Sequence, residues 1–210
     1  DLENVSSFAN EATIWDPEDN TADNNSSRVT VALSGRKVHL PLVIRNWPPI
    51  LTTELTADAD AVVIQGAPSA NFGDTSDMWV GYDHVGCHEN SDWGGGVSRS
   101  LVHFDLSTIP EGTWVKEATL NLYHANYCDI GQRTHNVTTH RIRGDWSSGS
   151  VTWNNRPSYA EAYGTTLLTS GDWGWYAFDV TDLVQGWVNG SFPNQGVMLR
   201  GPESSGDSSA

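Results

Sequence analysis

Lysine, positive charge and long apolar runs are scarce in this sequence. Lys37 and Lys116 are the only lysines, and the 210 residues hold 11 basic against 26 acidic side chains, for a formal net charge of −15. Nucleic acids and anionic membranes attract proteins through basic patches, so this balance speaks against both as partners. No run approaches the roughly 18 apolar residues of a membrane-spanning helix, so no membrane insertion is predicted.

Cysteine is nearly absent as well, with only Cys87 and Cys128. The chain begins at Asp1 without a methionine or an apolar signal stretch, which is typical of a processed protein or an excised fragment. Together with abundant Ser, Thr and Asn, this predicts an extracellular or cell-surface protein. Glycosylation sequons at Asn4, Asn24, Asn25, Asn136 and Asn189 add little, because Ser/Thr-rich chains contain them by chance.

The abundance of glycine, proline and tryptophan indicates a β-protein. The chain has 20 glycines, 9 prolines and 10 tryptophans, but only 18% charged residues, a loop-rich composition unlike that of a helical bundle. From Asp58 onward, short apolar runs recur with Gly, Pro, Asn and Asp between them, which predicts an antiparallel β-sandwich. The expected strands are 61–65, 78–82, 98–105, 118–124, 137–142, 150–153, 175–180 and 196–200. One short helix is expected, with Thr181 as its N-cap and Asn189-Gly190 at its end.

The first 56 residues form an extension of different texture. Residues 1–27 are acidic and too polar to bury a core by themselves. Residues 28–44 alternate in hydropathy on both sides of the turn signal Ser34-Gly35, which predicts one or two strands. Their apolar positions are Val29, Val31, Leu33, Val38, Leu40, Leu42 and Ile44. The predicted domains are therefore an N-terminal β-rich extension, 1–56, and a β-sandwich, 57–210.

An ordered series of motifs over residues 57–206 carries a resemblance to a known family. The series includes Ala59-Asp60-Ala61, Asn71-Phe72-Gly73, Arg99-Ser-Leu-Val-His-Phe-Asp-Leu106, Ala118-Thr-Leu-Asn-Leu-Tyr123, Val151-Thr-Trp-Asn-Asn-Arg-Pro157, Phe178-Asp-Val-Thr-Asp182 and Gly196-Val-Met-Leu-Arg-Gly201. In this order and spacing the chain resembles the DNRLRE-domain family, which is related to the family 96 carbohydrate-binding modules. The resemblance implies a jelly-roll-like β-sandwich of a secreted or cell-surface protein, with polysaccharide binding in some members.

The resemblance also implies one further strand after the last residues of this chain. A missing strand would leave backbone groups unpaired and a hydrophobic groove open. Residues 28–44 have the composition to fill such a groove. If they fill the groove of another copy, the contact is head-to-tail and propagates into a filament by donor-strand exchange. If they fold onto their own domain, no filament forms.

The cysteines are predicted to form a disulfide. Pairing strand 98–105 with strand 117–124 as a hairpin would place the loops 83–97 and 125–133 at one end of the sandwich, with Cys87 in one and Cys128 in the other. An oxidising compartment then favours a disulfide bond. The alternative is a zinc site, for which the available ligands are His84, Cys87, His88, His124 and Cys128.

Acidic residues before this hairpin are candidates for a calcium site, because calcium takes several oxygen ligands. The candidates are Asp58, Asp60, Asp83, Glu89 and Asp92, with Asp74 and Asp77 nearby. No EF-hand-type loop is present, so a solvated acidic surface explains the same residues. Asp105, Asp179 and Asp182 lie at predicted element ends, where carboxylates have structural roles. No catalytic motif is present, and a non-enzymatic protein is expected.

Tryptophans divide into two groups. Trp146, Trp153 and Trp187 fall in apolar positions and are expected in the core. Trp93, Trp173 and Trp175 fall in Gly-rich segments, where exposed aromatic rings can stack on sugars or be buried in an interface. The sequence thus predicts a non-catalytic extracellular structural subunit that forms filaments. The alternative is a polysaccharide-binding module that uses Trp93, Trp173 and Trp175.

Overall fold

The computed structural model describes residues 51–73, 75–83, 95–125, 134–169 and 172–204, and the backbone of two strands within 7–32. It divides into two compact units, Asp1–Glu54 and Leu55–Ala210. In the first unit, strand β1 (Ser7–Thr13) pairs antiparallel with β2 (Ser26–Ala32), and Phe8 lies opposite Val31. The predicted strand at Val29 and Val31 therefore exists, and its partner is a segment of the same chain. Leu33, Val38, Leu40, Leu42 and Ile44 lie outside the described residues.

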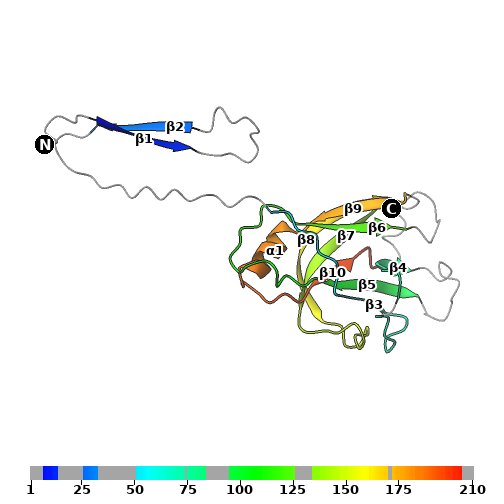
Figure 1. The fold of residues 1–210 in the computed structure, drawn as a ribbon. Coiled ribbons are helices and arrows are strands. Elements are labelled where there is room, and N and C mark those ends of the chain that lie inside the picture. Colours follow the sequence, from blue (N-terminus) through cyan, green and yellow to red (C-terminus); the bar gives the residue numbers. More distant parts are fainter. Residues whose placement is uncertain are drawn as a thin grey trace. The chain divides into compact units, whose positions relative to one another are not determined.

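The second unit is an all-β sandwich with one helix (Figure 1). Its larger sheet has the order β3-β5-β10-β7-β8, and β4 also pairs with β5. The smaller sheet pairs β6 with β9, and every pairing is antiparallel. The strands are β3 (Ala59–Ile64), β4 (Gly81–Asp83), β5 (Gly96–His103), β6 (Thr119–His124), β7 (Thr134–Arg143), β8 (Ser158–Thr169), β9 (Gly174–Asp179) and β10 (Val197–Arg200), and the helix is α1 (Thr181–Val188).

Successive side chains along the strands of the larger sheet point to opposite faces, and each face carries its own hydrophobic core. In β5, Val102 faces the smaller sheet and α1, while the adjacent Leu101 faces the opposite side. The first core joins both sheets and the helix through Val102, Leu120, Val137, Phe178, Val180, Leu183, Trp187, Val197 and Leu199. The second core contains Ala61, Val63, Leu101, Ile142, Val151 and Met198, with Trp146, Trp153 and Tyr159 packed against it. Of the three tryptophans expected in the core, Trp187 is buried in the first core, and Trp146 and Trp153 are partly buried against the second.

The fold class is as predicted, but the strand pairing is not. Strands β5 and β6 do not form the predicted hairpin, because they belong to different sheets. Residues 104–118 connect them, and Phe104, Leu106 and Ala118 of this connection pack on the first core. The place beside β5 is taken by β10, whose Val197 lies opposite Val102.

Three local expectations also need correction. Residues 150–153 form no strand, because Asn155 Oδ1 accepts hydrogen bonds from Thr152 N at 2.6 Å and Thr152 Oγ1 at 3.0 Å, which closes a turn. Strand β8 was not predicted, since its irregular register weakens the alternation. Thr181 is the first helical residue and not the N-cap, and Asp179 Oδ1 accepts its backbone N–H at 2.9 Å.

Candidate functional site

The outer face of the smaller sheet holds an unusual group of exposed aromatic side chains. In β6 and β9, Leu120 and Phe178 face the core, so the alternate positions face outward. Register places Tyr123 directly opposite Trp175 on that outer face. Their exposed fractions are 52% and 72%. Two large aromatic side chains exposed side by side form a contiguous apolar patch, and such patches mark candidate binding sites.

The two rings hold each other in place. Their centroids are 5.5 Å apart and their planes are inclined by 74°, an edge-to-face contact. Such a contact contributes about 0.5–1.5 kcal/mol beyond area burial. The Trp175 ring is thus oriented by its cross-strand neighbour. Trp173 lies two residues before Trp175 and is 66% exposed. We call Tyr123, Trp173 and Trp175 the aromatic platform.

Hydrogen bonds fix the backbone beneath the aromatic platform. His124 Nδ1 lies 2.8 Å from the carbonyl oxygen of Asp172, and the His124 ring meets Tyr176 edge to face at 5.8 Å. Thr166 Oγ1 donates to the carbonyl oxygen of Ala177 at 2.6 Å, which ties β8 to β9. These contacts attach the segment that carries Trp173 and Trp175 to the rigid sandwich.

A groove opens at the other end of the same outer face. It has a volume of about 600 Å³ and is lined by Lys116, Glu117, Thr119, Ala177, Asp179, Thr181 and Asp182. Thr119 lies opposite Asp179 in the β6–β9 ladder, and Asn121 lies opposite Ala177. The aromatic platform and the groove therefore occupy successive positions of one surface. Hydrogen bonds from the side chain and backbone of Thr181 hold the pKa of Asp179 below its usual value, so this carboxylate is ionised.

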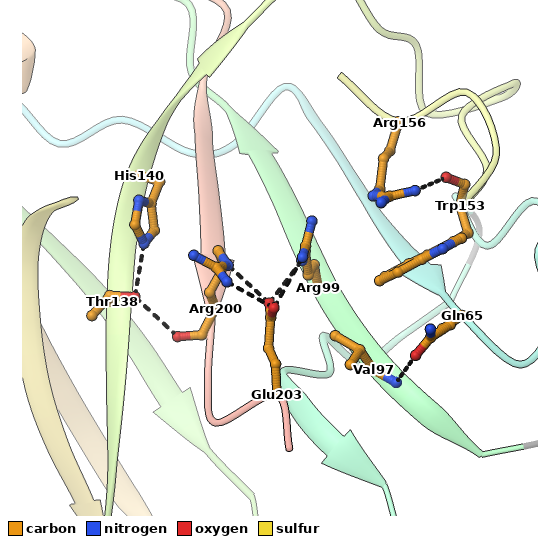
Figure 2. A network of polar contacts seen from close by, with 9 residues as sticks. All are labelled: Gln65, Val97, Arg99, Thr138, His140, Trp153, Arg156, Arg200 and Glu203. Atoms are coloured by element: carbon orange, nitrogen blue, oxygen red, sulfur yellow. Dashed lines mark hydrogen bonds and ion pairs between the residues drawn. The ribbon is translucent and has the colours of Figure 1, made fainter. Parts of the chain in front are cut away.

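A cluster of arginines around Glu203 lies on the face of the larger sheet that points away from the smaller sheet. Figure 2 shows this cluster at close range. Glu203 Oε1 accepts hydrogen bonds from Arg99 Nε and Arg200 Nε, both at 2.8 Å. Glu203 Oε2 accepts from the terminal nitrogens of the same two arginines, at 3.0 and 2.7 Å. Burial by itself would raise the pKa of Glu203, but these bonds outweigh it and lower the pKa to about 2.

Aromatic rings contact the guanidinium groups of the arginines in this cluster. The Arg99 guanidinium lies 5.1 Å from the Trp153 ring and 5.2 Å from the Tyr159 ring. Arg156 lies over Trp153 at 3.9 Å and Arg200 over Tyr159 at 4.4 Å. Arg156 also donates a hydrogen bond to the Trp153 carbonyl oxygen (Figure 2). The guanidinium groups of Arg99 and Arg200 thus neutralise the Glu203 carboxylate and stack on aromatic rings. These contacts cover the second core and hold the segment after β10 against the larger sheet.

The predicted calcium ligands that the structure describes, Asp58, Asp60 and Asp83, lie in or next to strands that pair with opposite ends of β5. Asp58 and Asp60 flank Ala59, which pairs with His103 at one end of β5, whereas Asp83 pairs with Gly96 at the other end. At about 3.4 Å per residue these ends are more than 20 Å apart, too far to share one ion. The Asp58 carboxylate instead lies 2.6 Å from His103 Nδ1. Among the described residues no group of three or more His, Cys, Asp or Glu could hold a metal.

Several predicted residues lie outside the described part of the chain. These are Asp74, His84, Cys87, His88, Glu89, Asp92, Trp93 and Cys128. The disulfide, the zinc alternative and the remaining calcium ligands therefore stay predictions. In the described residues, no helix has the length and hydropathy to cross a membrane.

A comparison with known protein families finds a match over nearly all of the second unit. The model of carbohydrate-binding module family 96 matches residues 51–209. The chain belongs to carbohydrate-binding module family 96. This match includes both sheets, α1, the aromatic platform and the groove, and confirms the relationship inferred from the ordered motifs. No curated protein matches the chain.

Tyr123 is the site residue that sequence analysis missed. Its signal was present, because Leu120 and Leu122 alternate inward and leave Tyr123 on the outer face. What the sequence did not show is that β9 pairs with β6 and places Trp175 beside it. Trp173 and Trp175 were expected in Gly-rich loops. Both are exposed, but Trp175 lies within strand β9.

Proposed function

We propose that this protein is a non-catalytic, extracellular polysaccharide-binding module and that the aromatic platform is its binding surface. The observation that carries the proposal is the exposed edge-to-face pair of Tyr123 and Trp175 on the outer face of a domain in this family. A sugar ring presents C–H bonds on its flat faces, and these meet the negative face of an aromatic ring favourably.

The platform suits a binding role better than a packing role. Trp173 and Trp175 expose most of their surface, although a folded chain normally buries tryptophan. The backbone of Trp175 is held by the β6–β9 ladder, and His124 contacts the carbonyl oxygen of Asp172 just before Trp173, so little backbone entropy is lost when a ligand binds. Rigid aromatic side chains on a fixed scaffold are typical of binding hot spots.

Filament formation by donor-strand exchange has less support. Val29 and Val31 of the proposed donor lie in β2, which pairs with β1 of its own chain. Light scattering and electron microscopy of the untreated protein test the filament hypothesis, and monodisperse particles of about 22.9 kDa would contradict it.

Affinity electrophoresis of the full chain in gels that contain soluble polysaccharides tests the proposed function. We expect retardation by at least one neutral polysaccharide, and loss of at least tenfold in affinity for Trp175→Ala and Trp173→Ala. Trp114→Ala is the matched control, because Trp114 is 63% exposed but precedes β6, away from Tyr123. Retardation that is equal for Trp175→Ala and Trp114→Ala would overturn the platform as the binding surface.

A further inference from the structure

The outer face of the β6–β9 sheet continues from the aromatic platform into the groove. Trp175, Ala177 and Asp179 occupy alternate positions of β9 and are all exposed. Their partners on β6 are Tyr123, Asn121 and Thr119, which are exposed as well. At about 3.3 Å per residue, the four steps from Trp175 to Asp179 span about 13 Å. A ligand that lies on the platform and follows the strands reaches the groove directly.

The chemistry of this face changes along its length. The platform end offers aromatic rings for stacking, whereas Ala177, which also lines the groove, has the smallest side chain of the row. At the groove end, Glu117, Asp179 and Asp182 present carboxylates, and Thr119 and Thr181 are hydroxyl-bearing residues. Carboxylates and hydroxyls accept hydrogen bonds from the hydroxyl groups of a sugar. Stacking at one end and hydrogen bonding at the other suit consecutive rings of one glycan chain.

The charge of the face selects the class of glycan. The groove holds three carboxylates against the single ammonium group of Lys116, and Asp172 is exposed beside the platform. The molecule as a whole has a net charge of −15. Repulsion between like charges opposes the approach of a polyanion to such a face, whereas a neutral chain meets no such barrier.

Resting on the proposed function, we infer that the module binds an uncharged polysaccharide lengthwise along β6 and β9, with successive sugar rings on the platform, over Ala177 and in the groove. The ligand is thus an internal stretch of a neutral glycan chain and not a single sugar or a chain end. Affinity then increases with chain length until both ends of the face are occupied. The groove contributes only to the longer ligands, because short ones are held by the platform alone.

Isothermal titration calorimetry of the full chain tests this arrangement. The probes are linear β-1,4-linked gluco-, manno- and xylo-oligosaccharides from disaccharide to hexasaccharide, with a polyuronate measured in the presence and absence of calcium. For at least one neutral series, affinity is expected to increase tenfold or more from the shortest binding oligomer to the hexasaccharide.

Two groove variants separate the inference from the proposed function. Ala177→Ile raises the floor of the face and is expected to abolish the increase with length, while affinity for the shortest binding oligomer stays within about twofold. Asp182→Asn removes one carboxylate and is expected to lower hexasaccharide affinity severalfold. Glu161→Gln is its control, because Glu161 is an exposed carboxylate of β8 outside the groove.

Each outcome decides a different claim. If Trp175→Ala abolishes binding but Ala177→Ile and Asp182→Asn keep the wild-type dependence on length, the lengthwise arrangement is wrong and the platform stands. If the polyuronate binds more tightly than every neutral series, with or without calcium, the assignment to uncharged glycans is wrong. If Trp175→Ala binds all probes as the wild type does, the proposed function itself fails.

Discussion

The carboxylate of Glu203 is chelated by the guanidinium of Arg99, 104 positions earlier in the chain, through two hydrogen bonds of 2.8 and 3.0 Å. Arg200 binds the same carboxylate in the same two-point manner. A residue just beyond the last strand is thereby fixed to the middle of the larger sheet, on the face opposite the smaller sheet. The consequences for stability can be measured independently of any ligand.

Replacing this carboxylate is expected to destabilise the fold. Glu203→Gln leaves two partly buried guanidinium groups without their anion, and we expect a loss of about 1–3 kcal/mol in the free energy of unfolding. Urea denaturation of wild type and variant measures it. Glu161→Gln is the control, since Glu161 meets Arg143 at 3.6 Å with both side chains more than half exposed, and should show no measurable change. Equal losses in the two variants would contradict a special role for Glu203.

The same carboxylate makes stability depend on pH. Its pKa falls from an ordinary value of 4.5 to about 2 on folding, so the unfolded chain binds the proton more readily than the folded one. The stabilisation is therefore complete above about pH 4.5 and is lost as the pH falls toward 2. Glu203→Gln should flatten this part of the profile in urea denaturation. Burial lowers the pKa of His140 below 6.5, so a decline that begins at higher pH should persist in the variant.

A backbone prediction concerns Gly196, which precedes β10. It has φ of +86°, and a Cβ atom there would lie 2.3 Å from the carbonyl oxygen of Val102. Gly196→Ala combines a left-handed conformation with a clash against the neighbouring strand, so we expect severe destabilisation or insoluble protein. Gly112→Ala isolates the conformational part, because Gly112 has φ of +75° and no atom within 4 Å of the added Cβ. It should cost about 1–2 kcal/mol. Similar thermal stability of the two variants would contradict the close approach at Gly196.

The predicted disulfide between Cys87 and Cys128 can be tested on the untreated protein. Thiol titration in denaturant should detect no free thiol before reduction and two afterwards. The bond would close a loop of about 40 residues, so reduction is expected to lower the free energy of unfolding by about 3–4 kcal/mol. Two free thiols in the untreated protein would eliminate the disulfide, and added zinc that protects both would favour the metal alternative.

Most strand positions of the second unit were predictable where burial follows local alternation, whereas β1 and β8 were missed. Leu120 and Leu122 in β6 and Phe178 in β9 alternate with exposed residues, and the sequence shows this directly. Pairing was not predictable, because it depends on contacts distant in sequence. Val197 joins Val102 and Arg141 in the middle of the larger sheet, and no local signal announces either partner.

The candidate site was predictable to the same extent. Trp173 and Trp175 stand out in a Gly-rich segment, and their exposure follows from that setting. Tyr123 and the groove depend on the pairing of β6 with β9, which brings together segments 48 or more residues apart, as the contact of His124 with Asp172 illustrates. The chelation of Glu203 by Arg99 had no local signal, because Arg99 lies 104 positions away in β5, whereas Arg200 lies only three residues before Glu203.

The most direct test of the account is a nuclear magnetic resonance titration that follows the indole N–H signals of the tryptophans. The ligand is whichever neutral oligosaccharide the calorimetric series identifies as binding. The account predicts that the indole signals of Trp173 and Trp175 shift in a saturable manner, while that of the partly buried Trp146 stays in place. Saturable binding that moves Trp114 and leaves Trp173 and Trp175 unchanged would contradict it.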